Sequence, residues 1–110
     1  MTPRFDTILI TGAAGRLGTE LRRGLAPLAR RLRLADAAPI QNLAPNEEAI
    51  AFDLADEAAT HAACEGVDAI VHFGGVPLER SWDSILNANI RGSYHVYEGA
   101  RKAGVKRVEI

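Results

Sequence analysis

A glycine-rich loop between an apolar run and an amphipathic segment constrains this fold more than any other feature of the sequence. The run Thr7–Thr11 (TILIT) predicts a buried strand, and leucines at three- and four-residue spacing over Leu17–Leu28 predict a helix. Between them, Gly12 suits a tight turn, Gly15 leaves the backbone open to a ligand, and Gly18 lets the helix approach the strand closely. This order predicts a dinucleotide-binding unit whose helix N-terminus receives the phosphates.

An acidic residue follows the second predicted strand. Asp36 comes directly after Arg31–Ala35 and eighteen residues after Gly18. At that strand end a carboxylate can accept hydrogen bonds from the ribose hydroxyls of an adenine nucleotide, and it would repel a 2′-phosphate. The pattern therefore predicts NAD rather than NADP, with Arg16 and Arg33 as the cations that could reach a 2′-phosphate.

Strand-like segments continue along the chain. Three further strands are expected, at Ala49–Phe52, Val67–Phe73 and Val105–Ile110. Residues 39–48 are expected to form the loop before the third strand. The alternation predicts an α/β fold, a Rossmann-like doubly wound parallel sheet in one NAD-binding domain over residues 1–110. Because the sequence stops inside its fifth predicted strand, we expect a sheet truncated after about five strands, the N-terminal part of a longer protein.

Helix boundaries are marked by local signals. Pro27 is expected to kink or end the first helix. Asp56 can cap a short alanine-rich helix, because its carboxylate can accept from the first-turn amides. Ser81 can cap a long helix over residues 82–103, and Gly104 suits the position just after its end.

Composition and charge favour an ordinary folded domain. The net charge is −1, and no apolar run approaches the roughly 18 to 20 residues of a membrane span. A cytoplasmic protein without a membrane or nucleic-acid partner is therefore expected. Five arginines are expected on a solvated helix face: Arg22, Arg23, Arg30, Arg31 and Arg33.

The cysteine and the histidines do not form a pattern typical of redox or metal chemistry. Cys64 is the single cysteine, and it is expected to be a small core residue. His61 and His95 lie on predicted helices and are expected at the surface, whereas His72 is expected to be a hydrogen-bonded strand residue. No metal site is predicted.

The chain as a whole resembles an extended short-chain dehydrogenase/reductase of the epimerase/dehydratase-like superfamily. The resemblance rests on TGAAGRLG from Thr11, on Asp36, on Asp53-Leu54, and on the segments HFGG and NIRGS. It implies a bound NAD, contacts of Asp53 and Leu54 with the adenine, and a path for residues 73–75 beneath the nicotinamide ribose. The positions that it assigns to cofactor binding are Gly12, Gly15, Arg16, Leu17, Gly18, Asp36, Asp53, Leu54, Phe73, Gly74, Gly75 and Asn89.

Several stretches are most similar to bacterial uronate dehydrogenases, which oxidise uronic acids to aldarolactones with NAD. The resemblance implies a catalytic Ser and a Tyr-x-x-x-Lys pair, but Tyr94 is followed by Glu98, and Tyr97 by Arg101. We therefore expect no catalytic residue in this chain and no turnover by it alone. The sugar-acid substrate would be bound only by a full-length parent.

Two other interpretations remain open. The parent could be a nucleotide-sugar epimerase or dehydratase, whose cofactor half is similar. Alternatively, the chain could be a stand-alone module that holds NAD or associates with a partner. Helices of this region often form the dimer interface in the superfamily, so a homo-oligomer through helix 82–103 is expected.

Overall fold

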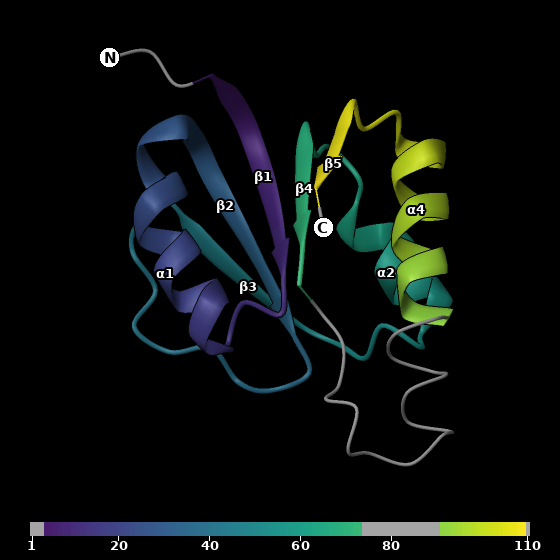
Figure 1. The fold of residues 1–110 in the computed structure, drawn as a ribbon, viewed down its shortest axis with the longest axis horizontal. Helices are drawn as coiled ribbons and strands as arrows, with labels where there is room; N and C mark the ends of the chain where they lie inside the picture. Colours follow the sequence, from purple (N-terminus) through teal and green to yellow (C-terminus); the bar gives the residue numbers. More distant parts are fainter. Residues whose placement is uncertain (1–3, 74–90, 110) are drawn as a thin grey trace.

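The structure, a computed structural model, describes residues 4–73 and 91–109 and contains a five-stranded parallel sheet (Figure 1). The strands are β1 Phe5–Thr11, β2 Ala29–Asp36, β3 Glu47–Ala51, β4 Ala69–His72 and β5 Arg107–Glu109. Their order in the sheet is β3-β2-β1-β4-β5, and all four pairings are parallel. The α/β prediction of a Rossmann-like parallel sheet is therefore confirmed.

Helices cover both faces of the sheet (Figure 1). They are α1 Arg16–Leu25, the 3₁₀ turn η1 Ala26–Leu28, α2 Glu57–Ala63 and α4 Gly92–Ala103. Side chains of β1 alternate between the two layers, because successive residues of a strand point to opposite faces. Leu9 joins a buried cluster with Val96 of α4, whereas Ile8 and Ile10 join the cluster beneath α1.

Local signals fixed the helix ends as predicted. Helix α1 ends at Leu25, and Pro27 lies in the 3₁₀ turn that follows. The Asp56 carboxylate caps α2 by accepting from the Ala59 amide at 3.1 Å. Gly104 ends α4 with φ 75°, a left-handed conformation that favours glycine. Ser81 lies outside the described residues.

The loop between β2 and β3 ends two residues earlier than the sequence indicated, at residue 46 rather than 48. Strand β3 already begins at Glu47, and in its register Leu32 lies opposite Glu47 and Arg33 opposite Glu48. Acidic residues at a strand start resemble a loop in sequence. Here they are kept in the sheet because each meets an arginine.

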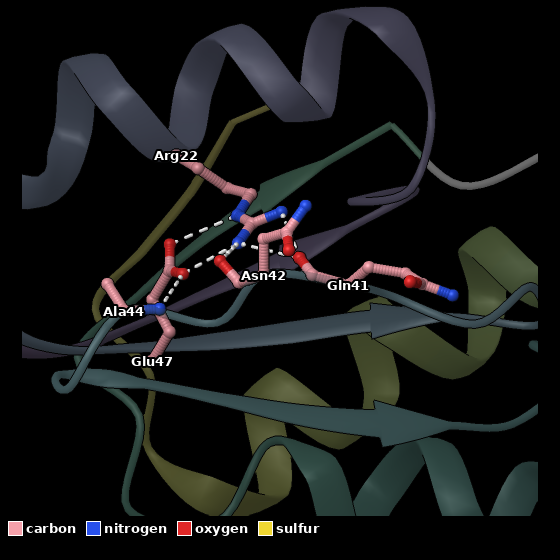
Figure 2. A network of polar contacts seen from close by, with 5 residues as sticks. All are labelled: Arg22, Gln41, Asn42, Ala44 and Glu47. Atoms are coloured by element: carbon pink, nitrogen blue, oxygen red, sulfur yellow. Dashed lines mark hydrogen bonds and ion pairs between the residues drawn. The ribbon is translucent and has the colours of Figure 1, made fainter.

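Arg22 of α1 holds the loop between β2 and β3 against the helix (Figure 2). Its Nε and Nη2 atoms donate to the two oxygens of Glu47 at 3.0 and 2.7 Å, and Nη2 also donates to the Asn42 carbonyl at 3.1 Å. Glu47 Oε1 accepts from the Ala44 amide at 2.8 Å. The expectation of a solvated arginine face is therefore wrong for Arg22, whose side chain is only 16% exposed.

The described helices include none with the length and apolarity that crossing a membrane requires.

Candidate functional site

Those predicted cofactor residues that the structure describes gather at the carboxyl edge of the sheet. Strands β1, β2 and β4 end there at Thr11, Asp36 and His72. The chain winds in opposite directions from β1, toward β2 on one side and toward β4 on the other. In open parallel sheets this switch point is where ligands bind, because adjacent connections diverge and leave a crevice.

The glycine loop forms the turn between β1 and α1. Gly12 has φ 70°, and its carbonyl accepts from the Gly15 amide at 3.1 Å. The Ala13 amide donates to the Ala35 carbonyl at 3.2 Å, which attaches the turn to the end of β2. A Cβ at Gly18 would lie 2.5 Å from the Gly12 oxygen, so the helix can approach the turn only with glycine there.

Gly15 behaves differently from Gly18. A Cβ at Gly15 would meet only the Gly12 oxygen, at 3.4 Å, which is an ordinary contact. The protein itself therefore leaves space at this position, as the role of admitting a ligand to the backbone requires.

The N-terminus of α1 suits an anion. Gly15 is the N-cap residue, and its carbonyl accepts from both the amide and the hydroxyl of Thr19, at 3.0 and 2.9 Å. The first turn contains no acidic side chain, so the positive end of the helix dipole is not neutralised by its own residues. Arg16 and Leu17 are exposed here. The exposure of Leu17, 61%, corrects its assignment to the apolar face of the helix.

Asp36 connects the end of β2 to the glycine loop. Its Oδ2 atom accepts from the Ala14 amide at 3.0 Å, and its Oδ1 atom accepts from the Ala38 amide at 2.9 Å. The carboxylate therefore lies beside the glycine turn, which is the position that the predicted role of Asp36 as a ribose-binding acid requires. These features together fit a dinucleotide that extends from α1 toward the end of β2.

Arg33 points away from this acid. Its Nε atom donates to Glu48 at 2.7 Å, and its Nη1 atom donates to the carbonyls of Ala63 and Glu65, both at 2.7 Å. Its side chain is 16% exposed, which corrects its placement on a solvated face. Because the Arg33 guanidinium already binds Glu48 and two carbonyls, it is not available to a 2′-phosphate at Asp36.

Asp53 and Leu54 follow the end of β3. The Asp53 carboxylate accepts from the Ala55 amide at 2.8 Å and is exposed. Leu54 packs against the core beneath α2 and α4, and its carbonyl lies 2.8 Å from His95 Nδ1. The structure thus ties this turn to α4, a contact that the sequence did not indicate.

His72 is a hydrogen-bonded strand residue, as predicted. It is 3% exposed, and its Nδ1 and Nε2 atoms lie 2.6 Å from Thr11 Oγ1 and 3.1 Å from Ser93 Oγ. Burial lowers the pKa of His72, which favours the neutral ring. Phe73 follows it and is 41% exposed, and its amide donates to Thr11 Oγ1 at 3.0 Å. The hydroxyls of Thr11 and Ser93 were not among the predicted site residues. For Thr11 the available signal was a hydroxyl residue at the end of a strand.

Three of the predicted cofactor positions, Gly74, Gly75 and Asn89, lie outside the described residues. Tyr94 and Tyr97 are exposed on α4, at 62% and 47%. Arg101, which stands where Tyr97 would need a lysine partner, donates to Glu98 at 2.9 Å.

The helical histidines are not surface residues. His61 and His95 are both half-buried, and His61 packs so closely on α4 that a Cβ at Gly99 would lie 3.1 Å from its ring. Cys64 is fully buried, as expected for a core residue, and burial raises the pKa of its thiol to about 11. Within residues 4–73 and 91–109, no group of three or more histidine, cysteine or acidic residues could hold a metal.

Residues 8–109 match the model of the NAD dependent epimerase/dehydratase family. The chain is 55% identical over 108 residues to a uronate dehydrogenase of Pseudomonas putida, and 53% identical over 108 residues to one of Pseudomonas syringae pv. tomato. These alignments cover 97% and 94% of this chain but only 40% and 38% of the relatives. The chain thus spans about two fifths of the length of these proteins.

The fold comparison agrees with the sequence comparison. A crystal structure of a uronate dehydrogenase mutant from Agrobacterium tumefaciens, complexed with NAD, superimposes with a TM-score of 0.89 at 48% identity. That alignment covers 94% of this chain and 39% of the other.

Proposed function

Since the chain belongs to the NAD dependent epimerase/dehydratase family, we propose that its 110 residues form the NAD-holding part of an enzyme that oxidises uronic acids to aldarolactones. Support comes from uronate dehydrogenases at 55% and 53% identity, which extend well beyond the region matched here. The domain therefore supplies cofactor binding, and substrate binding belongs to the whole enzyme.

The contact between Asp36 and Ala14 carries this proposal. It brings a carboxylate to within 3.0 Å of the amide of the glycine loop, although the two residues are 22 positions apart. The phosphate-binding turn and the ribose-binding acid are thereby held as one surface. Arg16, Leu17 and Gly18 complete the phosphate side, while Asp53 and Leu54 border the adenine side.

Selectivity for NAD over NADP follows from charge. Asp36 repels a 2′-phosphate, and Arg33 is held by Glu48 and two carbonyls. Arg16 is the remaining exposed cation that the sequence pointed to, and it belongs to the first turn of α1, where the pyrophosphate is expected.

The roles of the cofactor and of the chain's own residues in the reaction are distinct. Bound NAD supplies the acceptor for the hydride that leaves the sugar carbon. The chain's own residues bind and orient: the loop and α1 hold the phosphates, Asp36 holds the ribose, and Phe73 borders the nicotinamide side. Neither tyrosine of α4 is followed four residues later by the lysine of a Tyr-x-x-x-Lys pair, which general-base catalysis in this family uses.

Titration of the chain with NADH and NADPH, followed by calorimetry, tests the proposal. We expect weak binding of NADH and at least tenfold weaker binding of NADPH, because a charge repulsion of roughly 1.4 kcal/mol corresponds to tenfold. The Asp36→Asn variant should lose most of this discrimination while keeping its fold. Equal affinity for both cofactors, or none for NADH, would refute the assignment. Turnover of glucuronate by the chain alone would contradict its expected inactivity.

We also propose that α4 contributes to a homo-oligomer and that the protein is cytoplasmic. The exposed Tyr94 and Tyr97 support the first point, because large aromatic side chains are enriched at protein interfaces. Light scattering of the wild type and of a Tyr94→Ser/Tyr97→Ser variant tests it: association should be lost in the variant. Cell fractionation tests the location.

A further inference from the structure

One buried imidazole joins three elements at the nicotinamide side of the candidate site. Thr11 and His72 end β1 and β4 and lie opposite each other in the sheet register. Ser93 is the second residue of α4. The His72 ring lies between the two hydroxyls, with Nδ1 2.6 Å from Thr11 Oγ1 and Nε2 3.1 Å from Ser93 Oγ.

The distances indicate the direction of the hydrogen bonds. A separation of 2.6 Å is typical of a hydroxyl donor, whereas 3.1 Å is typical of an N–H donor. These distances favour the tautomer in which Thr11 donates its proton to Nδ1 and Nε2–H donates to Ser93. A neutral imidazole makes both bonds at once, since it has one N–H and one lone pair.

The Thr11 oxygen has a second task. It accepts from the Phe73 amide at 3.0 Å, although that amide also lies 3.2 Å from the Thr11 carbonyl. The carbonyl alone would satisfy the amide in the sheet ladder. The hydroxyl is thus an additional acceptor, and it fixes the backbone where the strand ends and the exposed Phe73 begins.

We propose that Thr11, His72 and Ser93 form a hydrogen-bonded relay that positions the Phe73 backbone against the nicotinamide half of NAD. The inference rests on the proposed function, because it assigns these three positioning residues to that site. Ser93 orients the imidazole, the imidazole orients the Thr11 hydroxyl, and the hydroxyl orients the Phe73 amide.

The test compares Thr11→Val, which removes the hydroxyl at nearly constant shape, with Thr11→Ser, which retains it. We expect Thr11→Val to weaken NADH binding about tenfold, the factor of roughly one buried hydrogen bond, and to shift the Phe73 amide resonance. Thr11→Ser should restore both within about twofold. Ser93→Ala should weaken NADH binding by a smaller factor, about threefold, because it removes only the outer bond of the relay.

Nitrogen NMR of the His72 ring provides a readout that does not depend on the cofactor. The relay requires a protonated Nε2 and an unprotonated Nδ1 in the wild type, and the opposite tautomer would overturn it. If NADH binds to the wild type and Thr11→Val lowers only the melting temperature, the hydroxyl stabilises the fold without positioning the site, and the inference is wrong. If the wild type does not bind NADH, the proposed function fails, and the inference that depends on it fails too; the tautomer then reports on the hydrogen bonds alone.

Discussion

Glu47 and Glu48 are adjacent in β3, yet their carboxylates pair with arginines on opposite faces of the sheet. Glu47 meets Arg22 of α1 at 2.7 Å, and Glu48 meets Arg33 of β2 at 2.7 Å on the side of α2. Successive side chains of a strand point to opposite faces of the sheet. The two adjacent glutamates therefore form ion pairs on both faces. Charges of this kind at an edge strand also discourage pairing with another chain.

Loss of the Arg22–Glu47 pair should destabilise the fold (Figure 2). Arg22→Leu leaves a carboxylate that is only 6% exposed without its cation, and we expect the free energy of unfolding to fall by about 3 kcal/mol in urea denaturation. Arg23→Leu, at the exposed neighbouring position of α1, should change it by less than about 0.5 kcal/mol. Equal losses of stability in the two variants would argue against a stabilising Arg22–Glu47 pair.

The same pair predicts a pH dependence. The hydrogen bond from Arg22 lowers the pKa of Glu47 below its ordinary value of 4.5. A lowered carboxyl pKa contributes stability that is complete above the unfolded-state pKa and is lost as pH falls through the folded-state pKa. The difference in unfolding free energy between the wild type and Arg22→Leu should therefore be largest near neutral pH and shrink in acid. A difference that grows in acid would contradict this sign.

Arg33 should contribute more to stability than its neighbour Arg31. Arg33→Met removes a carboxylate contact and two carbonyl contacts, so we expect a loss of about 2 kcal/mol in chemical denaturation. The side chain of Arg31 is 60% exposed and lies 4.0 Å from Glu48, so Arg31→Met should cost less than about 0.5 kcal/mol. The ranking fails if Arg31→Met is the more damaging change.

Replacing each of the two glycines of α1 by alanine should change the stability of the fold in opposite directions. Gly18→Ala places a Cβ 2.5 Å from the Gly12 oxygen, and we expect a loss of about 2 kcal/mol together with loss of NADH binding. Gly24 has nothing within 4 Å of a Cβ, so Gly24→Ala should gain about 0.5 kcal/mol from helix propensity alone. Thermal unfolding of both variants checks the two predictions. A Gly18→Ala variant as stable as the wild type would disprove the close approach of α1 to the Gly12 turn.

Cys64 should be unreactive in the folded chain. Burial raises its thiol pKa to about 11, so the thiolate is scarce at pH 8 and the sulfur is shielded as well. We expect negligible reaction with Ellman's reagent in native buffer and one equivalent in denaturant, because the chain has one cysteine. Rapid labelling under native conditions would mean that α2 and α4 separate easily.

Features that depend on neighbouring residues were predictable from the sequence. The glycine turn, the end of α1 before Pro27, the Asp56 cap and the left-handed Gly104 each follow from the conformational limits of one or two residues. The parallel sheet followed from the alternation of apolar runs with helical periodicity. Asp36 was predicted as a cofactor residue because it follows the second strand, eighteen residues after Gly18.

Contacts between distant segments were decided only by the tertiary structure. Sequence placed His61 and His95 at the surface, but α2 and α4 pack closely enough to bury both in part. It likewise left Arg22 and Arg33 in solvent, although their partners lie 25 and 15 residues further along the chain. Periodicity indicates which face of a helix or strand is apolar, but not which charged residues of another element lie next to it. Those neighbours depend on how the elements pack, and packing also brought Thr11, His72 and Ser93 together.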